Sequence, residues 1–156
     1  METHSSQKTL STFSINHTSS SFPLTKDSFQ FLYIINEGNL SKIWKVQHKK
    51  SLIYLVIKET PKLLITNKEQ LDTVLSEKNI LSSLHNNPFI TKMYCSFQDK
   101  KKLYLVLDYY NGGDLRYYAQ HHKRITESQL SKYCYHCLYI YIFECRIFSC
   151  KYLFRP

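Results

Sequence analysis

Glycine is scarce in this chain of 156 residues and occurs only at positions 38, 112 and 113. Because average usage is roughly 7%, a site that needs a glycine-rich backbone has only two places to lie. Collagen-like and repeat architectures are excluded as well. Acidic residues are also few, since 12 Asp and Glu stand against 21 Lys and Arg, and the formal net charge is +9. This balance suits phosphorylated ligands, nucleic acids and anionic lipids, and it selects none of them.

An apolar leader and a long apolar run are missing too. Residues 1–28 are polar and rich in Ser and Thr, so we expect a flexible lead-in and no secretory signal. The apolar stretch from Cys137 to Cys150 is interrupted by Glu144 and Arg146 and is shorter than the ~18 residues of a spanning helix. We therefore predict an intracellular, cytoplasmic protein with reduced thiols and no membrane contact. The cysteine spacing fits no common zinc module, and no metal site is expected.

The apolar pattern predicts an α+β fold. Hydrophobic residues make up 43% of the chain, which is enough for one domain. Apolar residues recur at helical spacing from Lys68 to Leu84, and two shorter helices are expected over Asp114–His122 and from Thr126 onward. Five segments have strand character: Phe31–Ile35, Ile43–Val46, Tyr54–Lys58, Thr91–Phe97 and Leu103–Leu107. Three strands, a helix and two strands in this order predict an antiparallel sheet with one packed helix.

One carboxylate in the predicted helix lies on its apolar face. Glu77 falls on the same helical stripe as Val74 and Leu81, so it faces the packed side. A buried carboxylate is unfavourable unless a cation meets it. The natural partner is Lys58, at the end of an apolar strand. The residues alone leave one alternative open, in which Glu77 lies at the edge of the stripe and is solvated.

Together these features resemble the N-terminal lobe of a eukaryotic protein kinase domain. Three sequence motifs are similar to those of the AGC group of Ser/Thr kinases: Ser76–Leu81, Asn87–Ile90, and Leu103–Leu115, which contains Gly-Gly-Asp. The resemblance covers Phe29 to Cys134. It implies a kinase-like small lobe, with a five-stranded antiparallel sheet and one αC-like helix, followed by the first helices of an incomplete C-lobe.

This resemblance divides the chain into four parts. The lead-in of residues 1–28 precedes an ATP-binding region at 29–110 and the start of the C-lobe at 111–134. Residues 135–156 form a tail in which Tyr, Cys, Phe and Ile dominate. Because A/T-rich non-coding DNA gives such a mixture when translated, we interpret the tail as divergent from the family.

The resemblance also implies an ATP site. Residues Asn36 to Ser41 stand where the family has Gly-x-Gly-x-x-Gly, and only Gly38 is kept. The missing glycines allow a tight bend close to the phosphates, so we expect weak ATP binding. Lys58 would contact the α- and β-phosphates, and Glu77 would be its ion-pair partner. The other residues implied at the adenine and ribose are Ile43, Val56, Leu107, Asp108, Tyr110 and Asp114.

The residues that carry out phosphoryl transfer are not found. The family uses an Asp for the substrate hydroxyl, and an Asn and an Asp for Mg²⁺. Here no Asp follows Asp114 and no Asn follows Asn111. We therefore expect no catalytic residue and no Mg²⁺ ligand, and a truncated member of the Ser/Thr kinase family that is inactive by itself.

Two alternatives remain open at this point. Besides the truncated kinase lobe, the chain could be a non-catalytic, pseudokinase-like interaction module, or a product of gene truncation or intron read-through without function. The first would bind another kinase lobe or a kinase-binding protein. Nucleic acid is not an expected partner, because the Lys and Arg residues are scattered rather than interleaved with aromatic residues.

Overall fold

The computed structural model describes residues 15–16, 24–84, 86–87, 90–111 and 127–128. The chain divides into two units, Met1–Tyr109 and Tyr110–Pro156. Most of the described residues belong to the first unit. The expectations for Asp114, for a helix over 114–122 and for the tail at 135–156 lie outside the described residues. Glu127 and Ser128, near the expected start of a later helix, have helical backbone.

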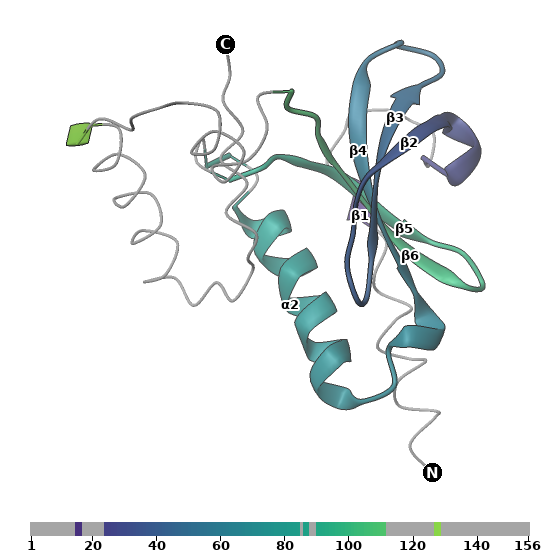
Figure 1. Ribbon diagram of the computed structural model, residues 1–156, viewed down its shortest axis with the longest axis vertical. Coiled ribbons are helices and arrows are strands. Elements are labelled where there is room, and N and C mark those ends of the chain that lie inside the picture. The colour runs from purple at the N-terminus through teal and green to yellow at the C-terminus, as the bar shows by residue number, and fades with distance from the viewer. Residues whose placement is uncertain (1–14, 17–23, 85, 88–89, 112–126, 129–156) are drawn as a thin grey trace. The chain divides into compact units, whose positions relative to one another are not determined.

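The first unit is an antiparallel sheet with one long helix beside it (Figure 1). The strand order is β1-β5-β6-β4-β3-β2, and every neighbouring pair is antiparallel. The predicted five-stranded sheet with a single packed helix is confirmed. Its strands are β2 (Phe29–Glu37), β3 (Lys42–His48), β4 (Tyr54–Pro61), β5 (Met93–Gln98) and β6 (Lys102–Asp108).

The structure adds a sixth strand that the sequence analysis did not predict. Strand β1 (Ile15–Asn16) pairs with Ser96 and Cys95 of β5, and Lys26–Ser28 forms a 3-10 turn, η2. Both lie in the segment expected to be a flexible lead-in. An edge strand presents unpaired backbone N–H and C=O groups, and β1 supplies partners for those of β5. A strand of two residues is too short to show any periodicity in the sequence.

Helix α2 (Lys68–Ser83) begins where side chains satisfy its first backbone groups. The Asn67 side chain accepts a hydrogen bond from the N–H of Gln70 at 2.8 Å. The Gln70 side chain in turn accepts from the N–H of Thr66, also at 2.8 Å. Such reciprocal capping fixes the start of a helix. The side chains buried along the helix are Leu71, Val74, Lys78 and Leu81.

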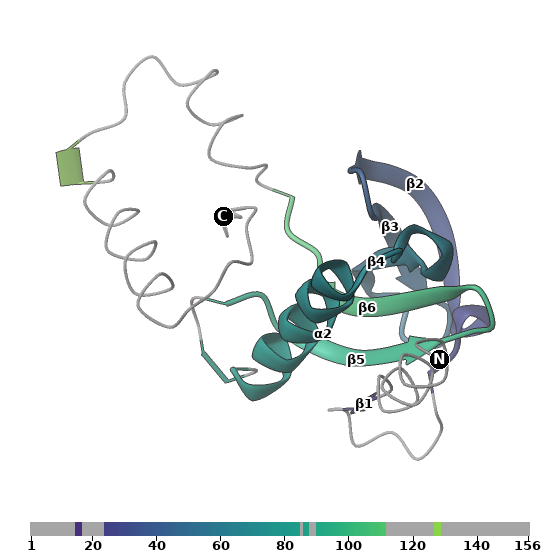
Figure 2. The ribbon, with the colours of Figure 1, turned by 90° about the horizontal axis from the view of Figure 1, so that it is seen from below.

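The core has two layers because the sheet is buried on both faces. Helix α2 packs across β5 and β6 on one face (Figure 2). In β6, Leu103 and Leu105 point to the helix, and the alternating Tyr104 and Val106 point to the other face. Burying each such side chain contributes about 1.5–3 kcal/mol. The helix-side cluster is Val74, Leu81, Met93, Leu103 and Leu105, and the opposite cluster is Phe29, Val46, Leu55, Ile57, Cys95, Tyr104 and Val106.

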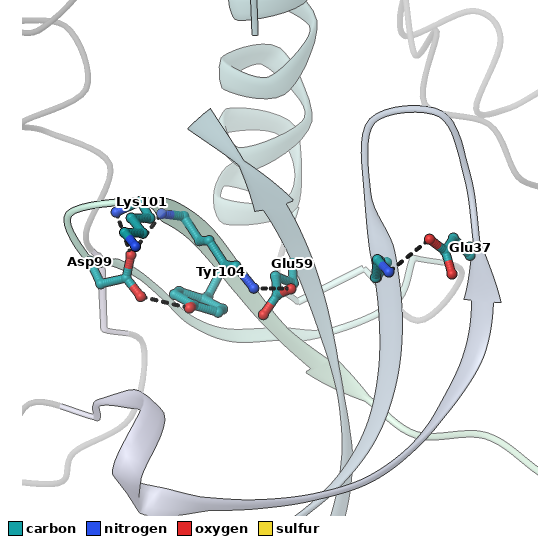
Figure 3. A network of polar contacts seen from close by, with 7 residues as sticks. Glu37, Glu59, Asp99, Lys101 and Tyr104 are labelled. Atoms are coloured by element: carbon teal, nitrogen blue, oxygen red, sulfur yellow. Dashed lines mark hydrogen bonds and ion pairs between the residues drawn. The ribbon is translucent and has the colours of Figure 1, made fainter. Parts of the chain in front are cut away.

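A polar network fixes the turn between β5 and β6 (Figure 3). Both the Lys101 and Lys102 N–H groups donate to Asp99 Oδ1 at 2.7 Å, and the Tyr104 hydroxyl donates to Asp99 Oδ2 at 2.7 Å. Burial and the Asp99 carboxylate raise the pKa of Tyr104. Lys102 Nζ also pairs with the buried Glu59 at 2.7 Å. The network therefore joins the turn to β4.

Candidate functional site

Two rows of side chains cross the face of the sheet on which α2 packs. Residues directly paired in antiparallel strands point to the same face, and Leu105 and Met93 show that this face is the helix side. The first row is Asn36, Ile43, Lys58 and Leu105. The second row is Tyr33, Lys45, Val56, Leu107 and Met93. Five residues expected at the site are thus neighbours on one face: Asn36, Ile43, Val56, Lys58 and Leu107.

An ion pair joins this face to the helix. Lys58 Nζ donates to both carboxylate oxygens of Glu77 at 2.6 Å. The side chains are only 24% and 14% exposed, so the pair is largely withdrawn from water. Lys58 lies inside β4 rather than at its end, because pairing with β6 continues to Pro61. A half-buried ammonium group held by a single carboxylate can approach an anionic ligand while the carboxylate fixes its position.

The loop between β2 and β3 is a tight turn. The Gly38 N–H donates to the Ser41 carbonyl at 2.8 Å, and the side chains of Lys42 and Glu37 form an exposed ion pair at 2.8 Å. A Cβ atom added at Gly38 would meet Ser41 O at 3.7 Å, an ordinary contact distance. The turn itself therefore tolerates a side chain at position 38. A need for glycine there would come from a ligand above the loop.

The end of β6 is anchored on the opposite face. Asp108 pairs with Leu55, and its carboxylate accepts from the Tyr94 hydroxyl at 2.7 Å. Its N–H donates to the Lys92 carbonyl at 3.1 Å. The side chain of Asp108 is therefore turned to Tyr94. Tyr110 is the first residue of the second unit.

A cluster at the same end of the sheet was missed by the sequence analysis. Lys45 Nζ lies 4.3 Å from the ring centre of Tyr109, 4.6 Å from that of Tyr54 and 5.5 Å from that of Tyr33. Its contact with Tyr109 raises the pKa of Lys45, although partial desolvation acts against it. One sequence signal pointed to this cluster: Tyr54, Val56 and Lys58 are alternate residues of one strand, so Tyr54 is expected on the same face as Lys58. The pairing of Lys45 with Val56 requires the register of the sheet.

Two further observations concern only the described part of the chain. No group of three or more His, Cys, Asp or Glu side chains is arranged there to hold a metal ion. None of the described helices is both long and apolar enough to span a membrane.

Comparison with known proteins agrees with this architecture. The protein kinase domain family matches residues 29–148, which extends past Cys134, where the recognised motifs ended. Human serine/threonine-protein kinase Sgk1 is 36% identical over 120 residues, which are 76% of this chain and 28% of Sgk1. Sgk-1 of Caenorhabditis elegans is 34% identical over 105 residues, 67% of this chain and 23% of that protein. Mouse protein kinase C eta type is 30% identical over 107 residues, 69% of this chain and 16% of that protein.

The sheet, the helix and the bridging ion pair thus define the small lobe of a protein kinase, and the chain belongs to the protein kinase domain family. Its relatives confirm the resemblance to AGC-like Ser/Thr kinases. The chain spans less than a third of the length of these curated relatives.

Proposed function

We propose that this region binds ATP on the helix-side face of the sheet, as the nucleotide-binding lobe of a Ser/Thr protein kinase. The observation that carries the proposal is the Lys58–Glu77 pair, which holds an ammonium group beside Ile43 and Val56. In this role Lys58 contacts the α- and β-phosphates, and Glu77 fixes its position. Because ATP is an intracellular ligand, we propose that the protein acts inside the cell.

The adenine base lies against the apolar residues of the two rows. Val56 and Ile43 contact the face of the adenine ring that is turned toward the sheet, and Leu107 lies at the inner end of the site. The Asp108 N–H donates to the Lys92 carbonyl, so Asp108 meets the base through its own carbonyl, which accepts from the adenine amino group. Tyr110 supplies a second backbone group, and Asp114 contacts the ribose.

The phosphate loop limits this binding. Asn36 and Ser41 occupy positions where glycine would let the backbone approach the phosphates, so we propose weak affinity. Mg²⁺ accompanies ATP in this family, but its usual Asn and Asp ligands have no counterpart after Asn111 and Asp114.

Phosphoryl transfer to protein Ser or Thr is the function we propose for a complete protein that contains this lobe. The 156 residues alone hold no Asp after Asp114 to orient a substrate hydroxyl. We propose that by themselves they bind nucleotide without transferring phosphate. A preparation free of other kinases that phosphorylates a protein, and loses this activity with Lys58→Ala, would contradict this part.

The proposed site is tested by titrating ATP and adenosine in parallel, with binding followed by NMR. Lys58→Ala should weaken ATP binding at least about tenfold and leave adenosine binding unchanged, because only ATP has the phosphates that Lys58 contacts. Lys49→Ala, an exposed lysine in the β3–β4 turn, is the matched control and should change neither. Equal ATP affinity in the wild type and Lys58→Ala, or no binding of ATP at millimolar concentration, would overturn the proposal.

A second candidate, a non-catalytic interaction module, is favoured by the edge strand β2. Its apolar side chains Leu32, Ile34 and Ile35 are 39–42% exposed, and an exposed apolar edge strand pairs readily with another chain. Under this alternative, binding to a purified protein kinase survives Lys58→Ala and is lost with Ile34→Asp. Titration calorimetry with both variants separates the two functions.

A further inference from the structure

We propose that Lys45 is a positioning residue for the base, acting through a tyrosine cluster at the end of β6. The cluster consists of Lys45, Tyr33, Tyr54 and Tyr109. It holds the backbone on either side of Tyr109 in place, so that adenine meets preformed hydrogen-bonding groups. The inference rests on the nucleotide site proposed above and adds a residue group to it.

The cluster joins four separate segments of the first unit. Lys45 comes from β3, Tyr33 from β2 and Tyr54 from β4, and Tyr109 directly follows β6. Lys45 is in register with Tyr33 on one side and with Val56 on the other. The Tyr54 and Tyr109 rings also meet edge to face, with centres 6.5 Å apart. The segment after β6 is therefore attached to three strands through one ammonium group.

The attachment point is next to the groups proposed to bind the base. Tyr109 lies between Asp108 and Tyr110, whose backbone groups are assigned to the adenine edge. On the opposite face, the Tyr94 hydroxyl holds the Asp108 carboxylate at 2.7 Å. The end of β6 is thus held from both faces, by Tyr94 through Asp108 and by Lys45 through Tyr109.

The contacts have the geometry of cation–π interactions. All three ring centres lie within 6 Å of Lys45 Nζ, the range in which an ammonium group is attracted to the ring face. Tyr33 and Tyr54 remain about half exposed, so each contact is of the modest, solvent-exposed kind. Losing Lys45 removes all three contacts at once and leaves Tyr109 with its edge contact to Tyr54. We expect adenosine binding to weaken about fivefold to tenfold.

A positioning role has a signature that packing alone does not produce. If Lys45 fixes the base-binding backbone, Lys45→Ala weakens adenosine and ATP by the same factor, and the ratio of the two affinities is unchanged. Lys58→Ala instead changes that ratio, because it acts on the phosphates. A residue that only stabilises the sheet would lower the free energy of unfolding without changing either affinity of the folded protein.

The experiment uses the full chain with Lys45→Ala, Lys45→Arg and the control Lys49→Ala. Adenosine and ATP are titrated by NMR, and backbone amide exchange is followed at 108–111 without nucleotide. Lys45→Ala should weaken both ligands about fivefold to tenfold and speed exchange at 108–111. Lys45→Arg keeps a cation over the rings and should bind within about twofold of the wild type. Lys49→Ala should match the wild type in every measurement.

A second variant pair keeps the test decisive if Lys45→Ala does not fold. Tyr109→Phe keeps the aromatic face and loses only the hydroxyl contact with Lys45, so it should weaken binding less than Tyr109→Ala, which should reproduce the loss. Unchanged adenosine affinity in a folded Lys45→Ala or Tyr109→Ala variant overturns this inference and leaves the nucleotide site standing. So does a changed ratio of ATP to adenosine affinity. Absence of binding by the wild type overturns both proposals.

Discussion

The Lys58–Glu77 pair allows the sharpest test of how this lobe is held together. We consider Lys58→Met, Glu77→Gln and the double variant, measured without nucleotide. Each replacement keeps the approximate length of the side chain and removes one charge. If the pair stabilises the contact between β4 and α2, the two single variants are not additive, and the double variant is less destabilised than their sum.

The size of this coupling follows from distance and burial. At the 2.6 Å of this pair, two charges attract by about 6 kcal/mol at an effective dielectric constant of 20, and desolvation of both groups offsets most of this. The side chains of Lys58 and Glu77 are 24% and 14% exposed, so the burial of this pair is intermediate between that of a surface pair and that of an interior pair. A fully exposed pair contributes about 0.2–1 kcal/mol. We therefore expect a coupling free energy of about 1–2 kcal/mol.

Urea unfolding followed by circular dichroism gives the free energy of each variant. The pair Lys42–Glu37 is the internal control, because its side chains are 40% and 56% exposed at a similar distance of 2.8 Å. Its cycle should give less than about 0.5 kcal/mol. A coupling for Lys58–Glu77 no larger than that of the control would refute the reasoning, because burial would then have no effect on the strength of the pair.

Three further predictions concern single residues. Leu52 has φ 58° and is exposed, so Leu52→Gly should raise the free energy of unfolding by about 0.5–1 kcal/mol, and a lower urea midpoint would contradict this. Gly38→Ala should leave that free energy within about 0.5 kcal/mol, since an added Cβ meets only Ser41 O at 3.7 Å. Burial raises the pKa of Cys95 to about 12, so mass spectrometry should find it unmodified by iodoacetamide at pH 8 until the protein unfolds. The unfolded thiol ionises first, so the contribution of Cys95 to stability is complete below about pH 8.5 and is lost as the pH rises to about 12.

Much of the fold could be predicted because its pattern is local. Short apolar runs located all five long strands, and helical spacing located α2 to within one residue of its observed end. Glu77 could be singled out for the same reason, because its place on an apolar stripe is visible in the sequence. These features depend on neighbours within a few positions along the chain.

The features that could not be predicted depend on register across the sheet. Glu59 follows Leu55 and Ile57 at alternate positions of β4, so its burial was detectable, but its partner Lys102 is set by the pairing of β4 with β6. Lys78 lies on the buried stripe of α2, where its pKa is lowered by burial. Helical spacing places it in line with Leu71, Val74 and Leu81, but a lysine is usually expected at the surface, and here its apolar stem is what packs.

Strand β1 has a consequence for the order in which the protein folds. Hairpins β2–β3 and β3–β4 connect neighbouring segments and can close within microseconds. Ile15 and Asn16 pair instead with Ser96 and Cys95, so this contact closes a loop of most of the lobe. During synthesis, β1 leaves the ribosome before the other described strands and has no partner until β5 has followed it. Because β5 itself joins the sheet through β6, β1 is the first of the described strands along the chain and the last that can be added to the sheet.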